Sequence, residues 1–281
     1  MAVAESIPVV VERLRAAGCV FAEEEARLLV ATATTPDDLD SMVARRVRGL
    51  PLEHVLGWAE FCGLRIVVDP HVFVPRRRTE FLVRQAEALL DGRAGGRRAV
   101  VVDLCCGSGA LGVALSAAVG ASVDPSVEVD LHAADLDPAA VRCARRNVVP
   151  AGGQVHSGDL YDALPGELCG RVDVLVANAP YVPTSQFPLL PAEARLHEAR
   201  MALDGGEDGL LLVRRVIAGA PDWLAPGGHL LVETSERQVP AAVEALARAG
   251  LVARVASSEE YQATVVIGTS PYQGSRIRQR Y

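Results

Sequence analysis

The sequence predicts a doubly wound α/β domain with a mostly parallel sheet, preceded by a small helical domain and a linking β-hairpin. From residue 99 onward, apolar runs of strand length alternate with segments of helical pattern, which is typical of a parallel sheet covered by helices on both faces. Residues 1–57 show helical spacing throughout. With 281 residues, the chain is long enough for one large core and a small second domain.

Residues 1–57 are expected to form the N-terminal helical domain. Apolar residues at helical spacing predict a first helix that ends near Gly18 and a second helix over 22–33. Asp37 or Asp38 can cap the third helix. Two interpretations of this domain are open: it covers part of the larger core, or it recognises a partner.

Residues 58–74 are expected to form the β-hairpin that links the two domains. Alternating side chains over 64–68 predict a strand, and the Asp69-Pro70 pair that follows indicates a turn. The main domain then takes in residues 75–281 and opens with a helix over 79–90.

Seven strands and four further helices are expected in the main domain. The strongest strand predictions are apolar runs at 99–104, 129–134, 172–177 and 229–233, and weaker ones lie at 154–156, 251–256 and 263–268. Helices are expected over 110–119, 138–147, 207–219 and 238–249. In such folds a ligand binds beyond the carboxyl ends of the strands, where the strand order reverses.

The composition excludes several kinds of chemistry. All 28 positive charges are arginines, so there is no lysine for a Schiff base or a phosphate-binding loop. The 35 acidic residues give a net charge of -7, which disfavours a protein that binds nucleic acid mainly through its phosphates. The six cysteines form no C-x-x-C pair, so no metal site is expected. We also expect a cytoplasmic protein without a membrane span, because neither a secretory signal nor a long apolar stretch occurs.

A glycine-rich turn after the strand at 99–104 is the first candidate site. Gly107 and Gly109 let a ligand approach the backbone where the next helix begins. Cys105 stands where a dinucleotide-binding fingerprint needs its first glycine, so that fingerprint is not matched. Asp103 would repel a pyrophosphate and favours a ligand with an ammonium group. The candidate cofactor-binding residues of this segment are Asp103, Cys105, Cys106, Gly107, Ser108 and Gly109.

Further acidic residues follow the next two strands. Asp135 ends the second strand, where a carboxylate can accept the ribose hydroxyls of an adenosine, and Asp137 is expected to cap the following helix. Asp159 follows the third strand and could accept from an adenine amino group. Together with the glycine turn, these acids favour an adenosine ligand that carries a positive charge. S-adenosylmethionine fits this description better than NAD.

The tetrapeptide Asn178-Ala179-Pro180-Tyr181 follows directly on the apolar strand at 172–177. Asparagine and proline often form ordinary turns after strands. The tyrosine, however, is one of only five and lies at the sheet edge where the ligand is expected. An ordinary turn and an active site are both compatible with the tetrapeptide alone.

These motifs resemble those of the protein-(glutamine-N5) methyltransferases, which modify the glutamine of the GGQ motif in peptide-chain release factors. The family signature is N-P-P-Y, and this chain has N-A-P-Y at 178–181. The segment from Val74 to Glu80 is similar to the family's I-P-R-P-E-T-E. Other similar segments are G-L-P-L-E-H-V-L-G at 49–57, E-F-C-G at 60–63, D-G-G-E-D-G-L at 204–210, and P-G-G at 226–228 with Glu233. The resemblance extends over 49–268.

The resemblance implies a Rossmann-like class I methyltransferase fold and the cofactor S-adenosyl-L-methionine, with S-adenosyl-L-homocysteine as product. It implies methyl transfer to the N5 amide nitrogen of a glutamine in a protein substrate, most of all a release factor. Asn178 and the carbonyl of Ala179 would hold that amide, and Tyr181 would pack against it, while Pro180 keeps residue 179 extended. The cofactor would contact the turn from Cys105 to Gly109, Asn178, and, near the ribose and adenine, Asp135, Leu136, Asp159 and Leu160.

Three departures from the family pattern concern this region. Ala179 replaces a proline, but its backbone carbonyl is still an acceptor. Cys105 replaces a glycine and therefore requires either a permissible φ angle or a slightly wider cofactor loop. Arg77 and Arg78 replace the Pro and Glu of I-P-R-P-E-T-E, which could alter how a substrate loop is held.

Three other functions are open. An adenine-N6 methyltransferase acting on DNA or RNA uses a similar motif; the arginines at 76–78 and at 276, 278 and 280 favour it, and the net charge of -7 disfavours it. A glutamine methyltransferase with a different protein substrate is a nearer alternative. The third is a binding scaffold that has lost cofactor affinity through Cys105 and Ala179.

Overall fold

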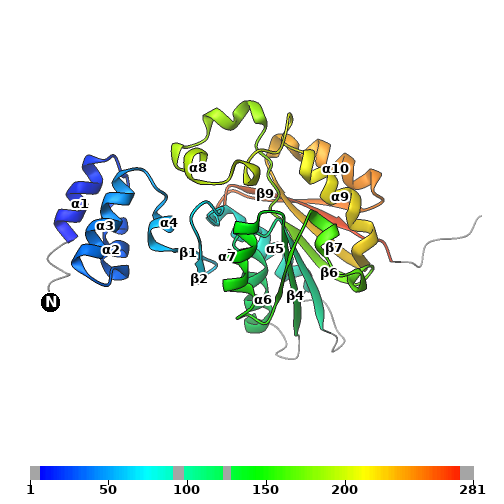
Figure 1. The fold of residues 1–281 in the computed structure, drawn as a ribbon. Helices are drawn as coiled ribbons and strands as arrows, with labels where there is room; N and C mark the ends of the chain where they lie inside the picture. The colour runs from blue at the N-terminus through cyan, green and yellow to red at the C-terminus, as the bar shows by residue number, and fades with distance from the viewer. Residues whose placement is uncertain (1–6, 91–97, 123–127, 273–281) are drawn as a thin grey trace, which may run out of the picture.

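A seven-stranded sheet organises the larger part of the molecule (Figure 1). The computed structural model describes residues 7–90, 98–122 and 128–272. The strand order is β5-β4-β3-β6-β7-β9-β8, in which β9 runs antiparallel to both of its neighbours and the other pairs are parallel. The strands are β3 (Ala99–Leu104), β4 (Val129–Asp135), β5 (Gln154–Ser157), β6 (Val172–Ala177), β7 (Leu224–Thr234), β8 (Val252–Ser258) and β9 (Ala263–Thr269).

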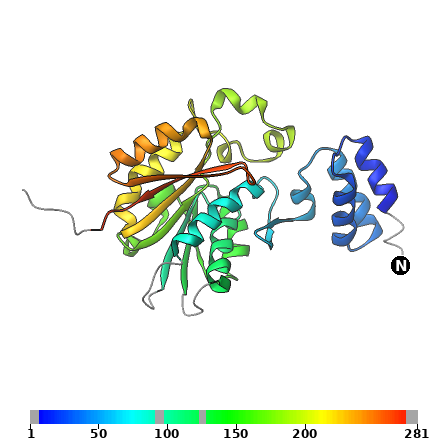
Figure 2. The same cartoon turned by 180° about the vertical axis from the view of Figure 1, so that it is seen from behind.

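Helices cover both faces of the sheet, as the alternating pattern predicts (Figure 2). On one face lie α5 (Glu80–Leu90), α6 (Ala110–Ser122) and α7 (Pro138–Val148); on the other lie α9 (Leu211–Trp223) and α10 (Val239–Arg248). All six residues of β3 are buried, and they alternate between the two cores: Val100 and Val102 pack with α9, whereas Val101 packs with α5 and α6. A central strand buried on both faces explains the unbroken apolar run in the sequence.

The strand order reverses between β3 and β6. Leu104, the last residue of β3, is in register with Ala134 of β4 on one side and Ala177 of β6 on the other. The loops that leave these three strands therefore meet at one edge of the sheet. This is the place where a doubly wound fold binds its ligand.

The N-terminal helices form a separate small core beside the sheet (Figure 1). They are α1 (Ile7–Ala16), α2 (Ala22–Thr32) and α3 (Pro36–Val47), followed by the short α4 (Leu52–Leu56). The cap of α3 corrects the prediction, because the Thr35 side chain accepts from the Asp38 backbone N–H at 3.1 Å. The expected cap of α7 is confirmed, with the Asp137 side chain accepting from Ala139 N–H at 2.8 Å.

The linking hairpin pairs β1 (Trp58–Phe61) with β2 (Leu64–Val67) and is shorter than the predicted 58–74. The turn between the strands is Cys62-Gly63, and residues 68–74 form no strand, although His71 makes an isolated parallel bridge with Glu198. Asn147 of α7 fastens the hairpin, because its side chain bonds both backbone groups of Val67 at 2.9 Å and the Ser108 carbonyl at 2.8 Å. The division of the chain at 57/58 and 74/75 stays a prediction.

The segment between β6 and α9 differs most from the prediction. It contains the 3-10 helix η5 (Thr184–Leu189), the short helix α8 (Ala192–His197) and the 3-10 helix η6 (Arg200–Ala202), none of which the pattern indicates. The helix expected over 207–219 begins at Leu211, because Gly206 and Gly209 take φ angles of +89° and +76° and form a turn. Within the described ranges, no helix meets the length and apolarity needed to cross a membrane.

Candidate active site

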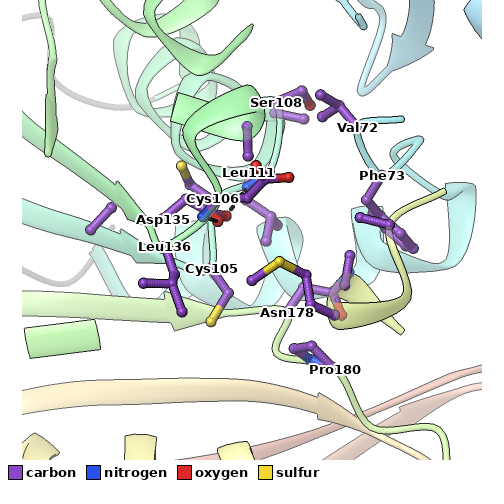
Figure 3. A pocket seen from close by; sticks show the side chains of 18 of the residues that line it. Val72, Phe73, Cys105, Cys106, Ser108, Leu111, Asp135, Leu136, Asn178 and Pro180 are labelled. Atoms are coloured by element: carbon purple, nitrogen blue, oxygen red, sulfur yellow. Dashed lines mark hydrogen bonds between the residues drawn. The ribbon is translucent and has the colours of Figure 1, made fainter. Parts of the chain in front are cut away.

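A cavity opens at the carboxyl ends of β3, β4 and β6 (Figure 3). Its walls come from the loops after these strands and from the segment that follows the hairpin. Of the predicted cofactor-binding residues, eight and Asn178 line it, while Asp103 and Gly109 do not. The lining members of the prediction are Cys105, Cys106, Gly107, Ser108, Asp135, Leu136, Asp159, Leu160 and Asn178.

The turn after β3 carries a left-handed backbone at a residue that is not glycine. Cys105 has a φ of +55°, in the left-handed region that favours glycine, so its side chain is held in a disfavoured backbone conformation. Gly107 has the same φ, and a Cβ there would meet only Phe73, at 4.0 Å, across the cavity. Gly109 serves packing, because a Cβ on it would lie 2.5 Å from the Val148 side chain. The turn therefore leaves open space on the cavity side of Gly107, whereas Gly109 packs tightly against α7.

Asp135 connects the loops after β3 and β4. One carboxylate oxygen accepts the Gly107 N–H and the other the Asp137 N–H, both at 2.9 Å. Burial, more than any other cause, raises the pKa of Asp135. Each oxygen retains a lone pair for a further donor, so the side chain can still accept ribose hydroxyls from the cavity.

Asp103 lies beneath the turn and away from the cavity wall. It is fully buried, and its Oδ2 accepts the Gly112 N–H at 2.9 Å near the start of α6. Its Oδ1 has no partner among the described residues. Burial raises the pKa of this carboxyl group to about 7. Asp103 does not line the cavity, and its contact with the ammonium group of a ligand stays a prediction.

The loop after β5 carries the second left-handed residue of the site, Leu160, with a φ of +50°. Beside it, Asp159 lines the cavity and is paired with Arg215 of α9 at 2.8 Å. Its carboxylate is thus shared between a surface arginine and the cavity.

The four residues of the N-A-P-Y turn do not all face the cavity. Asn178 and Pro180 line the cavity, whereas Ala179 is buried in the core that faces α9. The Tyr181 hydroxyl donates to Glu233 Oε1 at 2.8 Å, and burial together with this carboxylate raises the pKa of Tyr181. Tyr181 does not line the cavity in which Asn178 lies.

Two neighbouring loops hold the backbone of this turn. The Gln238 side chain donates to the Tyr181 carbonyl at 2.8 Å and to the Asp208 carbonyl at 3.1 Å. A Cβ on Gly205 would lie 2.6 Å from the Pro180 carbonyl oxygen, and one on Gly209 would lie 2.3 Å from that of Tyr181. The glycines of D-G-G-E-D-G-L are thus required by close backbone approach to the N-A-P-Y turn.

A second hollow, which we call the distal cleft, lies on the other side of Tyr181. Arg78 and Glu233 belong to it, and Arg78 Nε lies 3.1 Å from Glu233 Oε1. Its walls come from η2 (Arg77–Thr79), the segment after Pro180 and the loops that follow β7 and β8. Its lining residues include Arg78, Tyr181, Val182, Pro183, Glu233 and Thr234.

Several cavity residues were missed by the sequence interpretation. Thr79 is buried, lines the cavity, and has a hydroxyl oxygen without a partner among the described residues. Its position in V-P-R-R-R-T-E is the signal that could have found it. Phe73 and Met201 also line the cavity, but no periodicity or motif marks them. No group of three His, Cys, Asp or Glu side chains suited to a metal ion occurs within 7–90, 98–122 and 128–272.

Known proteins with similar sequences and a similar fold are methyltransferases. Residues 66–213 match the methyltransferase small domain family. A release factor glutamine methyltransferase of Geobacter sulfurreducens is 37% identical over 211 residues, which cover 74% of this chain and 69% of that protein. A 4-amino-L-phenylalanine/4-methylamino-L-phenylalanine methyltransferase of Streptomyces pristinaespiralis is 39% identical over 244 residues, or 81% of this chain and 80% of that protein.

A solved methyltransferase structure from Pyrococcus furiosus shares the fold. It superposes with a TM-score of 0.52 at 16% identity, covering 83% of this chain and 99% of the other. A release factor glutamine methyltransferase of Bordetella pertussis is 40% identical over 212 residues, which cover 75% of this chain and 74% of that protein. The chain therefore belongs to the methyltransferase small domain family and, within it, to the release factor glutamine methyltransferases.

Proposed function

We propose that this protein transfers a methyl group from S-adenosylmethionine to the N5 side-chain nitrogen of a glutamine in a protein substrate, with the GGQ motif of a peptide-chain release factor as the acceptor. The observation that carries the proposal is the N-A-P-Y turn at the point where the strand order reverses. Its Asn178 lines the same cavity as Asp135 and the glycine-rich turn after β3. Membership of the family supports the same chemistry.

The cavity suits an adenosyl cofactor with a sulfonium centre. Gly107 leaves room that a Cβ would reduce, since only Phe73 lies within 4.0 Å of that position. Asp135 offers carboxylate lone pairs for hydroxyl donors, and the buried Thr79 hydroxyl offers a polar group with no partner among the described residues. When bound, the cofactor supplies an electrophilic methyl group. Cys105 to Ser108, Asp135, Leu136, Asp159 and Leu160 would hold it.

Residues of the N-A-P-Y turn position the substrate amide that accepts the methyl group. The Asn178 side-chain oxygen and the Ala179 backbone carbonyl accept the two N–H groups of the substrate amide, which turns the nitrogen toward the cavity. An amide nitrogen is a poor nucleophile, so orientation and electrostatic complementarity must supply most of the rate. Gln238, Gly205 and Gly209 support this role by holding the turn from behind.

A second candidate is methylation of the aromatic amine of a free amino acid. One relative, that of Streptomyces pristinaespiralis, is named for this activity and aligns over 81% of this chain. An aromatic amine is a planar nitrogen donor like an amide, so the same two acceptors could orient it. The observation that favours this candidate is Arg78, which stands where the motif of the glutamine methyltransferases has an acid and which pairs with Glu233 near the turn.

A parallel labelling experiment tests the proposal. The protein is incubated with methyl-labelled S-adenosylmethionine and, separately, with release factors, ribosomal proteins, 4-amino-L-phenylalanine and adenine-containing DNA or RNA. We expect label on a release factor and none on nucleic acid. Label on the free amino acid alone selects the second candidate, and label on adenine contradicts both.

A further inference from the structure

The distal cleft and the cofactor cavity share one turn as their dividing wall. Asn178 and Pro180 face the cavity, while Tyr181, Val182 and Pro183 line the cleft. In a glutamine, only two methylene groups separate the side-chain amide from the Cα. Whatever holds the amide at Asn178 must therefore leave space close by for the main chain of the same residue.

Glu233 is the unusual group of the cleft. It is the second-to-last residue of β7 and is almost completely buried, with 1% of its surface exposed. Its Oε1 accepts from the Tyr181 hydroxyl at 2.8 Å and lies 3.1 Å from Arg78 Nε. Its Oε2 is also buried but has no hydrogen-bond partner in the described part of the chain, and the same holds for the neighbouring Thr234 hydroxyl. Buried polar oxygens are normally hydrogen-bonded, so these two unpaired oxygens point to a hydrogen-bond partner that a ligand supplies.

Arg78 brings the complementary group. Its side chain is 47% exposed, and its guanidinium lies 5.6 Å from the centre of the Tyr181 ring. A guanidinium has five N–H donors, more than one carboxylate oxygen and one phenol can accept. Arg78 can therefore donate to a substrate oxygen while it stays on Glu233. The cleft thus presents an acceptor and a donor side by side.

We propose that the distal cleft binds the main chain of the acceptor amino-acid residue. Glu233 Oε2 accepts the main-chain N–H of that residue, and the Arg78 guanidinium donates to its carbonyl oxygen. This inference rests on the proposed methyl transfer at the N-A-P-Y turn and extends it to the recognition of the acceptor. The same two contacts would serve the ammonium and carboxylate of a free amino acid, so the source of the main chain is decided by the test.

Position 78 is where the Arg78–Glu233 pair differs from the motif of the glutamine methyltransferases. The motif of the glutamine methyltransferases has an acid where this chain has Arg78, whereas the tyrosine of the N-P-P-Y signature is kept as Tyr181. Two acids beside the tyrosine would favour only donors from the substrate. The Arg78–Glu233 pair favours a donor and an acceptor together, as a main chain offers.

Binding measurements on the intact protein saturated with S-adenosylhomocysteine test this directly. The probes are an end-blocked peptide that contains Gly-Gly-Gln, the same peptide with a methyl group on the main-chain nitrogen of the glutamine, and free 4-amino-L-phenylalanine. The variants are Glu233→Gln and Arg78→Gln, and the control is Arg77→Gln, whose arginine is exposed on the same 3-10 turn but does not line the cleft. Calorimetry gives the Kd of each probe and of the cofactor.

We expect Glu233→Gln and Arg78→Gln to weaken binding of the unmodified peptide by about tenfold or more, because each loses a charged hydrogen bond. The Kd of S-adenosylhomocysteine should not change, and Arg77→Gln should behave like the wild type. The N-methylated peptide should bind the wild type as weakly as the unmodified peptide binds Glu233→Gln, with no further loss on that variant.

Other outcomes separate this inference from the proposed function. Glu233-dependent binding of the peptide without any methyl transfer supports the cleft assignment and contradicts the glutamine methyltransferase activity. Glu233-dependent binding of 4-amino-L-phenylalanine alone supports the same contacts with a free amino acid. Equal losses for both peptides on Glu233→Gln, a parallel loss of cofactor binding, or no binding of any probe to the wild type overturns the assignment.

Discussion

Cys105 and Leu160 show that the site tolerates backbone strain at individual residues. Both have positive φ angles without being glycine, and both line the cofactor cavity. A side chain in the left-handed region costs about 1–2 kcal/mol, and such residues collect at functional sites where the surroundings hold them. The surroundings of Cys105 therefore hold it in the left-handed conformation that a glycine at this place would adopt.

Substitution of Cys105 by residues of different backbone tolerance tests this strain. Valine is β-branched and disfavours a positive φ, so Cys105→Val should lower the free energy of unfolding by about 2 kcal/mol. Cys105→Gly should stay within about 1 kcal/mol of the wild type, since relief of strain offsets the entropy gained by the unfolded chain. Urea unfolding measures both. Equal stabilities of the two variants would show that residue 105 is not strained.

Asp135 is the residue on which the cofactor affinity should depend most. Asp135→Ala removes the acceptor for a ribose and also frees the Gly107 and Asp137 N–H groups, so the Kd for S-adenosylmethionine should rise by about 10- to 100-fold. Asp162→Ala, at an exposed position that does not line the cavity, is the matched control and should bind normally. Calorimetry distinguishes them. An unchanged Kd for Asp135→Ala places the ribose elsewhere.

At the scale of elements, the sheet could be predicted far better than the connections. The apolar runs 99–104 and 172–177 coincide with β3 and β6, because a strand buried on both faces needs an unbroken apolar segment. The loops after these strands gave the cavity residues for the same reason, since strand ends determine where loops meet. Asn178, which follows β6, was found in this way, and so was Asp135 at the end of β4.

The segment over 184–202 could not be predicted, because distant contacts hold it. Glu193 of α8 pairs with Arg46 of α3 at 2.5 Å, and Glu198 pairs with Arg76. These partners lie 147 and 122 residues away in the sequence, so no local pattern reveals them. Asp103 illustrates the same limit at the site, because only the packed structure shows that its side chain turns toward Gly112.

The loop that follows β7 should control the geometry of the N-A-P-Y turn. Gln238→Ala removes the donor to the Tyr181 and Asp208 carbonyls, and the loss of these two hydrogen bonds should cost about 1–3 kcal/mol of stability. We expect kcat to fall by about tenfold or more while the cofactor Kd stays the same, because the turn orients the acceptor. Glu244→Ala on the exposed side of α10 is the control. A loss of stability without any fall in kcat would make Gln238 purely structural.

At the scale of the whole molecule, Asp103 makes stability depend on pH. Burial raises its pKa from the ordinary 3.8 to about 7 in the folded protein. Between these values the folded state keeps a proton that the unfolded state has released, so the contribution of Asp103 is largest below pH 4 and declines as the pH rises toward 7. Asp103→Asn removes the titrating group and therefore this pH-dependent contribution to the free energy of unfolding.

The difference in the free energy of unfolding between wild type and Asp103→Asn should therefore shift in favour of the variant from pH 4 to pH 7. Urea unfolding at a series of pH values measures it. Parallel profiles of the two proteins over this range would show that the carboxyl group titrates normally in the folded state.

Methyl transfer to a protein glutamine is the claim on which the whole account depends. The most direct measurement is tandem mass spectrometry of a purified release factor after incubation with this protein and S-adenosylmethionine, with Asn178→Ala in parallel. We expect one added methyl group on the side-chain nitrogen of the GGQ glutamine with the wild type, and none with Asn178→Ala. An unmodified glutamine with the wild type, or full methylation by Asn178→Ala, would contradict it.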